Sequence, residues 1–534
     1  MKHSRRAFLL GAAATPLLHA CGGGPAAPGV RVLRPGMREG HALRDAHALP
    51  APSGELRCAV AVLGSGVAGL SAAWRLAREG MRDVLLIDGP EPDGNAAAGL
   101  LGGIACPRGA HYLPLPGTDA LHVREILADL GILHGDPRAA RPDYDEQALV
   151  HPAAERTLYK GVWHEGLMPR HSAASIAAGQ RFNGAMAGFA ARTGGDGHPA
   201  FTLPLAACSQ DASLRALDRQ TFAAWLDAEG HTEPSLRRYI DYAMRDDYGA
   251  AARTVSAWAG IHYFTCRRGE AANAETGAVL TWPQGLSALT GGMRARLHGG
   301  RTLDGYAAAI SERRDHVSVT VVREAGRSVT VRAGHVICAM PLSVARRIDP
   351  ALAERLPAHA LPATAPWLVC NALLDGFPQE KPGTDLAWDN VVHEGAGLGY
   401  VVATHQLTRV ARPASTVFTT YQSGWSDAPA ARRWLADAGD DALLDAALAD
   451  LDAAYGPRWR ARLRAAELVL RAHAMALPLP GFLDAPARAL RTPAGRVLHA
   501  HADLSGLSLF EEASWWGDVA ARHLLGQGAQ NAAG

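Results

Sequence analysis

The chain has 534 residues, of which 48% are hydrophobic and 20% charged. This composition is typical of a folded soluble protein, and the length predicts two closely packed domains. The 53 basic and 52 acidic residues leave a formal net charge of +1, so the chain has no long-range field for polyanions and nucleic acid is excluded as a partner.

The first 21 residues are expected to be an export signal. Arg5 and Arg6 begin a twin-arginine signature, and the apolar stretch that follows to Leu18 is too short to span a membrane. Leu18-His19-Ala20-Cys21 is typical of a lipoprotein processing site, at which the Cys21 thiol is acylated; an ordinary cleavage site that happens to contain Cys is the alternative. We therefore expect the twin-arginine translocase as a partner, a periplasmic location and a lipid anchor in a membrane.

Residues 22–55 are rich in Gly, Pro and Ala and show no sustained periodicity, which predicts a flexible tether, with the ordered chain beginning near Arg57. Apart from Cys21, six cysteines are scattered along the chain without a CxxC pair or metal-ligand spacing. Several lie in apolar runs, so we expect buried free thiols and no metal site, and the spacing identifies no disulfide.

A complete βαβ unit follows the tether. Residues 58–63 are a continuous apolar run, as expected of a strand buried on both faces. Residues 70–79 have helical character and end at Gly80, and residues 83–88 predict a second buried strand that ends in an acid.

The turn between the first strand and the helix carries the motif Gly64-Ser65-Gly66-Val67-Ala68-Gly69. The first glycine permits a tight turn, the second lets the backbone approach a pyrophosphate, and the third lets the helix pack against the strand. The helix start, which includes Val67 and Ala68, would face the phosphates with its positive end. Asp88, 24 residues after Gly64, is placed to bind the hydroxyls of an adenosine ribose. The unit predicts dinucleotide binding without distinguishing FAD from NAD.

Hydrophobic patterns predict further elements of both types. They are a helix over 213–227 with Ser213 as its N-cap, strands over 317–322 and 329–332 around a polar turn, another strand over 335–339, an amphipathic helix over 441–455, a short strand over 497–500 and a terminal helix over 511–525. This mixture places the chain in the α/β class.

Five further segments favour one kind of dinucleotide-binding protein. They are residues 102–112, 282–286 with 291–293, 336–341, 501–503 and 510–517. Through these segments the sequence resembles the flavin-containing amine oxidase family, which also includes protoporphyrinogen oxidases and phytoene desaturases. The resemblance extends over residues 57–525 and is specific at the two ends and in the two middle segments.

The resemblance implies FAD as the cofactor and a Rossmann-like FAD-binding domain intertwined with an α+β substrate domain. The FAD-binding domain would comprise residues 56–135, 276–365 and 481–530. The substrate domain would comprise residues 136–275 and 366–480.

The resemblance also implies roles for residues far from the glycine motif. Asp503 would lie near the pyrophosphate or the ribityl chain. Glu512 and Ala513 would lie at the start of the terminal helix, whose positive end would stabilise the anionic reduced flavin. Arg108 would contact the phosphates or the flavin edge; a cation of a surface loop is the alternative.

Two departures from the family pattern leave the catalytic residues unknown. Many amine oxidases carry a Lys that holds a water near flavin N5, and residues 368–372, where it should fall, contain none. Leu509 stands where many carry an aromatic residue over the flavin. The following residues are candidates to line the substrate cavity, with a core role as the alternative: Arg245–Gly249, Trp258, His262 and Tyr263.

The leading interpretation is an exported, amine oxidase-like FAD-dependent oxidoreductase that moves a hydride from a small-molecule substrate, such as an amine, to flavin. Such a transfer requires mainly a positioned C–H bond and a dry pocket. A flavin desaturase or dehydrogenase of an apolar substrate is an alternative, which the missing Lys favours. A non-catalytic flavoprotein that serves as a binding subunit is another. A dehydrogenase that uses NAD alone would leave the C-terminal segments unexplained.

Overall fold

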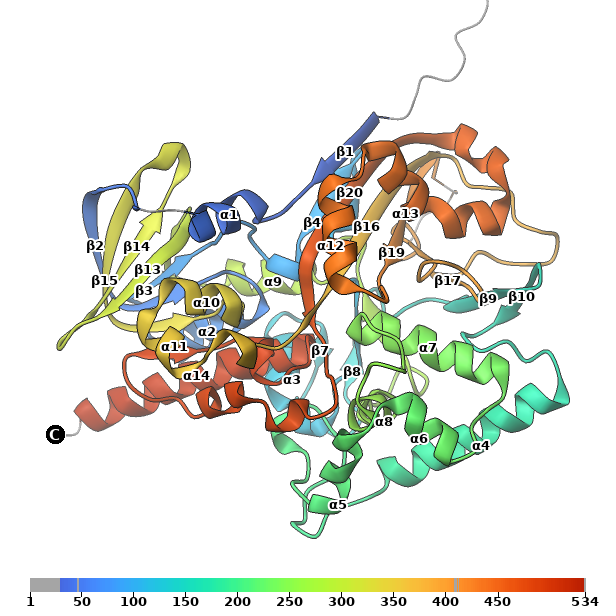
Figure 1. Ribbon diagram of the computed structural model, residues 1–534, viewed down its shortest axis with the longest axis horizontal. Helices are drawn as coiled ribbons and strands as arrows, with labels where there is room; N and C mark the ends of the chain where they lie inside the picture. The colour runs from blue at the N-terminus through green and yellow to red at the C-terminus, as the bar shows by residue number, and fades with distance from the viewer. Residues whose placement is uncertain (1–28, 46–47, 408–410, 412, 533–534) are drawn as a thin grey trace, which may run out of the picture.

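A computed structural model describes residues 29–45, 48–407, 411 and 413–532. Two large sheets, one of seven and one of eight strands, lie side by side, each with its own helices (Figure 1). The predicted fold class is confirmed: a Rossmann-like domain is intertwined with an α+β substrate domain. Cys21 and the rest of the expected export signal lie outside the described residues.

The seven-stranded sheet is assembled from three separated parts of the chain. Its order is β12-β3-β2-β15-β14-β13, with β21 beside β15. Its strands are β2 (Pro52–Leu63), β3 (Val84–Ile87), β12 (Arg301–Leu303), β13 (Tyr306–Glu312), β14 (Val317–Val322), β15 (Ser328–Cys338) and β21 (Val497–His499). Strands β2 and β3 run parallel, as the predicted βαβ unit requires.

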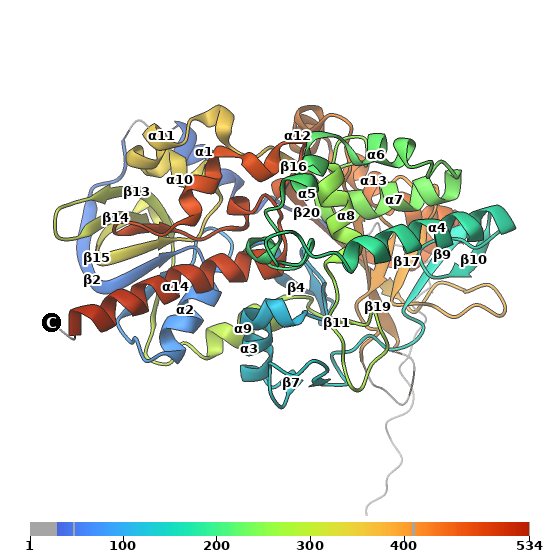
Figure 2. The ribbon, with the colours of Figure 1, turned by 90° about the horizontal axis from the view of Figure 1, so that it is seen from below.

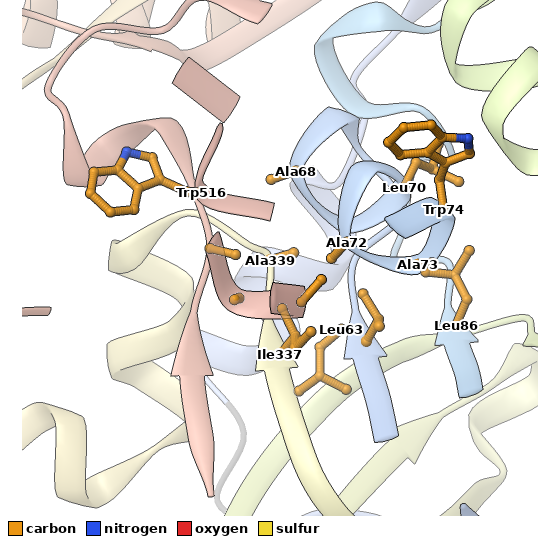
Figure 3. Packing of buried hydrophobic residues seen from close by; sticks show 14 of the residues in the cluster. Leu63, Ala68, Leu70, Ala72, Ala73, Trp74, Leu86, Ile337, Ala339 and Trp516 are labelled. Atoms are coloured by element: carbon orange, nitrogen blue, oxygen red, sulfur yellow. The ribbon is translucent and has the colours of Figure 1, made fainter. Parts of the chain in front are cut away.

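Helices α2 (Val67–Arg78) and α14 (Phe510–Ala532) lie side by side against this sheet (Figure 2). The buried Arg75 of α2 donates a hydrogen bond of 2.5 Å to Asp518 of α14 and pairs with Glu125 of α3 (Leu121–Asp129). Apolar residues of α2, among them Trp74, fill the space above the ends of the parallel strands (Figure 3). The start of the chain and its end are thereby packed into one core.

The eight-stranded sheet belongs to the substrate domain and has the order β1-β20-β16-β19-β18-β17-β9-β10. Its strands are β1 (Gly29–Leu33), β9 (Glu155–Tyr159), β10 (Val162–Glu165), β16 (Thr364–Asp375), β17 (Asp389–Val392), β18 (Tyr400–Val402), β19 (Ser415–Gln422) and β20 (Leu463–Ala476). Helices α12 (Ala428–Asp437) and α13 (Asp440–Tyr455) pack an apolar cluster against it.

Five more helices of the substrate domain lie below this sheet in Figure 1. They are α4 (Ala173–Ala190), α5 (Ala212–Arg215), α6 (Phe222–Ala228), α7 (Pro234–Tyr248) and α8 (Ala257–Thr265). The other helices are α1 (Met37–Asp45), α9 (Ser287–Ala295), α10 (Leu342–Ile348) and α11 (Pro350–Arg355). Three two-stranded ribbons complete the fold: β4 (Ala98–Leu101) with β5 (Ile104–Pro107), β6 (Tyr112–Pro114) with β11 (Val279–Thr281), and β7 (Leu133–His134) with β8 (Asp143–Tyr144).

The structure differs from the predicted tether over residues 22–55. Residues 29–33 form β1, which pairs in parallel with β20, and residues 37–45 form α1. Val30 and Val32 pack against the apolar cluster of the substrate domain. Five alternating residues are too short a pattern to stand out in a Gly- and Pro-rich sequence, because the partner strand is more than 400 residues away.

Two other elements also differ from their predictions. The helix predicted over 213–227 is divided, because Thr221 caps a new helix, α6, and Asp211 rather than Ser213 caps α5. The strand predicted over 335–339 is the end of β15, which runs without a break from Ser328. The domain boundaries given above remain predictions.

The six cysteines in the described residues are buried and free, as predicted. Within the same residues, no helix is long and apolar enough to cross a membrane.

Candidate functional site

The turn between β2 and α2 has the geometry that its glycine motif predicts. Gly64 has a φ of +104°, and a Cβ on it would lie 2.7 Å from the carbonyl oxygen of Ala339. A Cβ on Gly69 would lie 1.8 Å from the Gly64 carbonyl oxygen, so only glycine lets α2 pack this closely. At Gly66, by contrast, no described atom lies within 4 Å of the Cβ position. The turn is therefore open at the point where the pyrophosphate is expected.

The start of α2 offers free donors to this opening. No side chain caps the helix, and its first turn has no acidic residue. In the described part of the chain, the N–H groups of Gly66, Val67 and Ala68 have no hydrogen-bond acceptor. Unpaired N–H groups at the positive end of a helix form an anion site, so these residues fit the pyrophosphate of FAD.

Asp88, at the end of β3, is held by a residue that the sequence did not single out. Its carboxylate accepts a hydrogen bond of 2.8 Å from Arg294 of α9. Arg294 also lies 3.7 Å from Asp93. Nη2 of Arg294 and Oδ1 of Asp93 are buried without a hydrogen-bond partner among the described residues. Hydroxyl groups of a ribose could satisfy both atoms, which are costly to bury unpaired.

Asp503 is buried between β21 and α10. It accepts a hydrogen bond of 2.9 Å from the N–H of Leu342, and its carboxylate lies 3.3 Å from Nδ1 of His501. Burial disfavours its charge, but His501 and the Leu342 N–H outweigh burial and lower the pKa of Asp503. The residue is therefore a fixed negative charge beside the start of α10.

At the start of α14, Glu512 and Ala513 take different positions. Glu512 is fully buried, and its carboxylate accepts hydrogen bonds from the N–H of Leu205 and from the Ser505 hydroxyl. Burial raises the pKa of Glu512. Its side chain is thus bonded to protein, which leaves the backbone at the helix start as the part of this residue that can face a flavin. Ala513 is half-buried on the first turn.

Arg108 lies at the junction of the two domains and is not a free surface cation. It donates two hydrogen bonds, of 2.7 and 2.8 Å, to Glu467 of β20, which is 1% exposed. Arg31 of β1 pairs with the same carboxylate. Burial acts to raise the pKa of Glu467, but the two guanidinium groups outweigh it, so the pKa is lowered. Whether Arg108 also binds the cofactor stays a prediction.

A cavity of ≈ 520 Å³ opens beside the residues that follow Arg108. His111 and β6 line its inner end, and α4, α7, β9, β17 and β18 contribute other walls. Its lining includes the aromatic side chains Tyr112, Tyr239, Tyr242, Tyr263, Trp388 and Tyr421. Burial lowers the pKa of His111 to about 3, so this ring is uncharged at neutral pH.

Three carboxylates from separate elements also line the cavity: Glu155 of β9, Asp246 of α7 and Asp389 of β17. Burial raises the pKa of each, and for Asp246 the nearby Asp247 adds to the rise, to about 7. The mutual repulsion of the three charges acts in the same direction on Asp389. The cavity therefore concentrates negative charge that has been taken out of bulk water.

The comparisons with known proteins agree with this architecture. The model of flavin containing amine oxidoreductases matches residues 67–472. The chain belongs to that family. It is therefore an FAD-dependent oxidoreductase, and the open turn at Gly66 is its expected pyrophosphate site. No curated protein sequence matches the chain.

Solved structures of similar fold include two amine oxidases. Wild-type putrescine oxidase bound to putrescine shares 16% identity with a TM-score of 0.64, over 88% of this chain and 100% of the other. Cyclohexylamine oxidase from Brevibacterium oxydans IH-35A shares 17% identity with a TM-score of 0.62, over 88% of this chain and 99% of the other. At these identities the likeness extends to the fold alone.

Of the cavity candidates named from the sequence of this amine oxidoreductase, Asp246 and Tyr263 line the cavity. The others, Arg245, Asp247, Tyr248, Gly249, Trp258 and His262, lie outside its lining. Asp247 instead pairs with Arg267, and Trp258 and His262 stack on each other within the helical core.

The strand that should carry the family's Lys has Asn371 at its centre, which donates a hydrogen bond of 2.9 Å to the Pro107 carbonyl. Within the described residues, no lysine lines the cavity. Sequence reasoning missed Glu155 and Asp389 because each lies alone in a strand. A signal was available at Asp389, where a charged residue interrupts an otherwise buried apolar strand.

Proposed function

We propose that this protein oxidises an amine at the carbon next to its nitrogen, passing a hydride to FAD and forming an imine. The observation that supports the proposal most directly is the aromatic cavity with three carboxylates. Ammonium groups bind carboxylates and aromatic faces, whereas a hydrocarbon substrate would leave buried carboxylates without a partner. This disfavours the desaturase alternative.

The chain's own residues would orient the substrate and exclude water. Tyr421 and His111 stack at 4.8 Å near the inner end, and the Tyr421 hydroxyl donates a hydrogen bond of 3.1 Å to the Gly109 carbonyl. This fixes a rigid wall between the cavity and the segment that contains Arg108. FAD, when bound, supplies the two-electron acceptor, and oxygen or another acceptor would reoxidise it. Carboxylates with raised pKa values can accept the proton that an ammonium must lose before its oxidation.

The test is an absorbance spectrum of the purified protein before and after anaerobic addition of a panel of amines. We expect a flavin spectrum that at least one amine bleaches, with peroxide formed if oxygen is the acceptor. Dithionite is the control, because it reduces bound flavin whatever the substrate. Flavin that dithionite bleaches and no amine bleaches would refute amine oxidation and favour a desaturase or a binding subunit.

We also propose export by the twin-arginine route and lipid anchoring at Cys21 in the periplasm. The proposal rests on Arg5, Arg6 and the segment that ends at Cys21. Only eight residues separate Cys21 from Gly29, where β1 begins, and they reach at most about 29 Å. An anchor would therefore keep the substrate domain near the membrane. Cys21→Ser should release the protein into the soluble periplasmic fraction; unchanged membrane association would contradict the anchor.

A further inference from the structure

Two of the cavity carboxylates are direct neighbours across paired strands. In the parallel pairing of β9 and β17, Glu155 lies opposite Asp389. Neighbouring strands are about 4.8 Å apart, and opposite residues of a pair point to the same face. Both side chains line the cavity, and Asp246 of α7 lines it from a different wall.

This arrangement is unfavourable for the protein alone. Like charges directly opposite each other destabilise a sheet, and burial adds to the cost. Among the described residues, no Arg, Lys or His forms an ion pair with Glu155, Asp246 or Asp389. The one arginine that lines the cavity, Arg267, is paired with Asp247 and stacked 4.5 Å from the Tyr263 ring. The cavity therefore has an unbalanced negative charge.

The unbalanced charge does not match a metal ion. In the described chain, no group of three or more His, Cys, Asp or Glu residues could hold one. Carboxylates spread over separate walls suit an extended cation with charges at more than one point. The aromatic walls suit the methylene chain between those charges, and Tyr and Trp faces also attract ammonium groups. A volume of ≈ 520 Å³ is in the range of small-molecule sites.

We infer that the cavity selects a linear diamine or polyamine, one ammonium of which is held by the pair Glu155–Asp389 while the other amine is oxidised at the inner end near His111. The inference rests on the proposed amine oxidation and names its substrate class. A monoamine would leave the pair without a counter-ion. Glu155 and Asp389 are thus specificity-determining residues that do not touch the reacting carbon.

The test compares 1,4-diaminobutane and 1,8-diaminooctane, each with the n-alkylamine of equal carbon number. Anaerobic flavin reduction gives the rate, and the thermal midpoint of the oxidised holoenzyme gives binding without turnover. The variants are Glu155→Gln and Asp389→Asn, which keep side-chain shape. Glu394→Gln is the matched control, because Glu394 is exposed, outside the cavity and five residues after Asp389.

We expect at least one diamine to exceed its monoamine about 10- to 100-fold in kcat/KM, as loss of a hydrogen-bonded charge pair implies. Each cavity variant should remove most of this difference by raising the diamine KM, with kcat and monoamine kinetics little changed. Glu394→Gln should behave as the wild type. The diamine should raise the thermal midpoint of the wild type more than that of either cavity variant.

Monoamines that equal the diamines in rate and in thermal shift would overturn the inference and leave amine oxidation standing. Equal losses for diamine and monoamine in the cavity variants would also overturn it, because they would indicate a general structural effect. If no amine bleaches the flavin, amine oxidation itself fails, and the thermal shift still decides whether the cavity prefers a dication.

Discussion

The three glycines of the β2–α2 turn differ in what surrounds them, so equal substitutions should have unequal effects. Around Gly64 and Gly69 the protein backbone occupies the place of a Cβ, and around Gly66 nothing described does. Gly66 also has a φ of −71°, which any residue adopts without strain. Its glycine identity therefore serves the cofactor rather than the fold.

We predict that Gly66→Ala lowers FAD affinity while the apoprotein keeps its stability. Gly69→Ala should instead destabilise the apoprotein by about 1–3 kcal/mol, because the new methyl group meets backbone, and should lower the flavin content too. The measurements are the flavin-to-protein absorbance ratio and the thermal midpoint of the apoprotein. Equal destabilisation by both substitutions would contradict the assignment of Gly66 to the cofactor.

Asp246 makes a second residue-scale prediction, on pH. Because its pKa is raised to about 7 in the folded protein, the folded state keeps a proton that the unfolded state loses above about pH 4. Ligand-free stability should therefore fall as the pH rises from about 4 to about 7, by at most about 1.4 kcal/mol per pH unit. Asp246→Asn should remove this fall. Thermal midpoints across this range decide it, and parallel curves for wild type and variant would contradict it.

At the scale of elements, β1 shows what sequence reasoning can and cannot reach. The βαβ unit was predictable because its strands, turn and helix are adjacent and strongly patterned. Strand β1 was not, since five residues gain their meaning only from β20, more than 400 residues later. The same reason hid Glu155 and Asp389, whose proximity is a matter of strand register. The cofactor site was largely predictable, whereas the substrate cavity required the fold.

Strand β1 also contributes to the junction of the domains through Glu467, which it shares with Arg108. Glu467→Gln should destabilise the protein by about 1–3 kcal/mol, because two guanidinium groups lose their charged acceptor. Arg31→Ala should cost no more than about 1 kcal/mol, since Arg31 is largely exposed and Arg108 stays paired. Urea denaturation of both variants tests this order. A larger loss for Arg31→Ala would mean that β1, rather than Glu467, dominates the junction.

Over the whole molecule, the FAD-binding domain is closed by the contact between its first and last helices. At this contact Gly517 of α14 passes so close to α2 that a Cβ would lie 2.2 Å from the carbonyl oxygen of Ala68. Ala68 belongs to the first turn of α2, beside the free N–H groups. The position of α14 is therefore coupled to the pyrophosphate site across more than 400 residues of sequence.

We predict that Gly517→Ala displaces α14 from α2 and lowers both the thermal midpoint and the flavin content. Gly526→Ala is the matched control on the same helix, because nothing described lies within 4 Å of a Cβ there. Alanine exceeds glycine in helix propensity by up to about 1 kcal/mol, so the control should keep its flavin and gain slightly in stability. If Gly517→Ala retained full flavin at an unchanged midpoint, the close contact would not be what couples the two ends of the domain. If both substitutions lowered flavin equally, the effect would belong to α14 as a whole and not to its packing on α2.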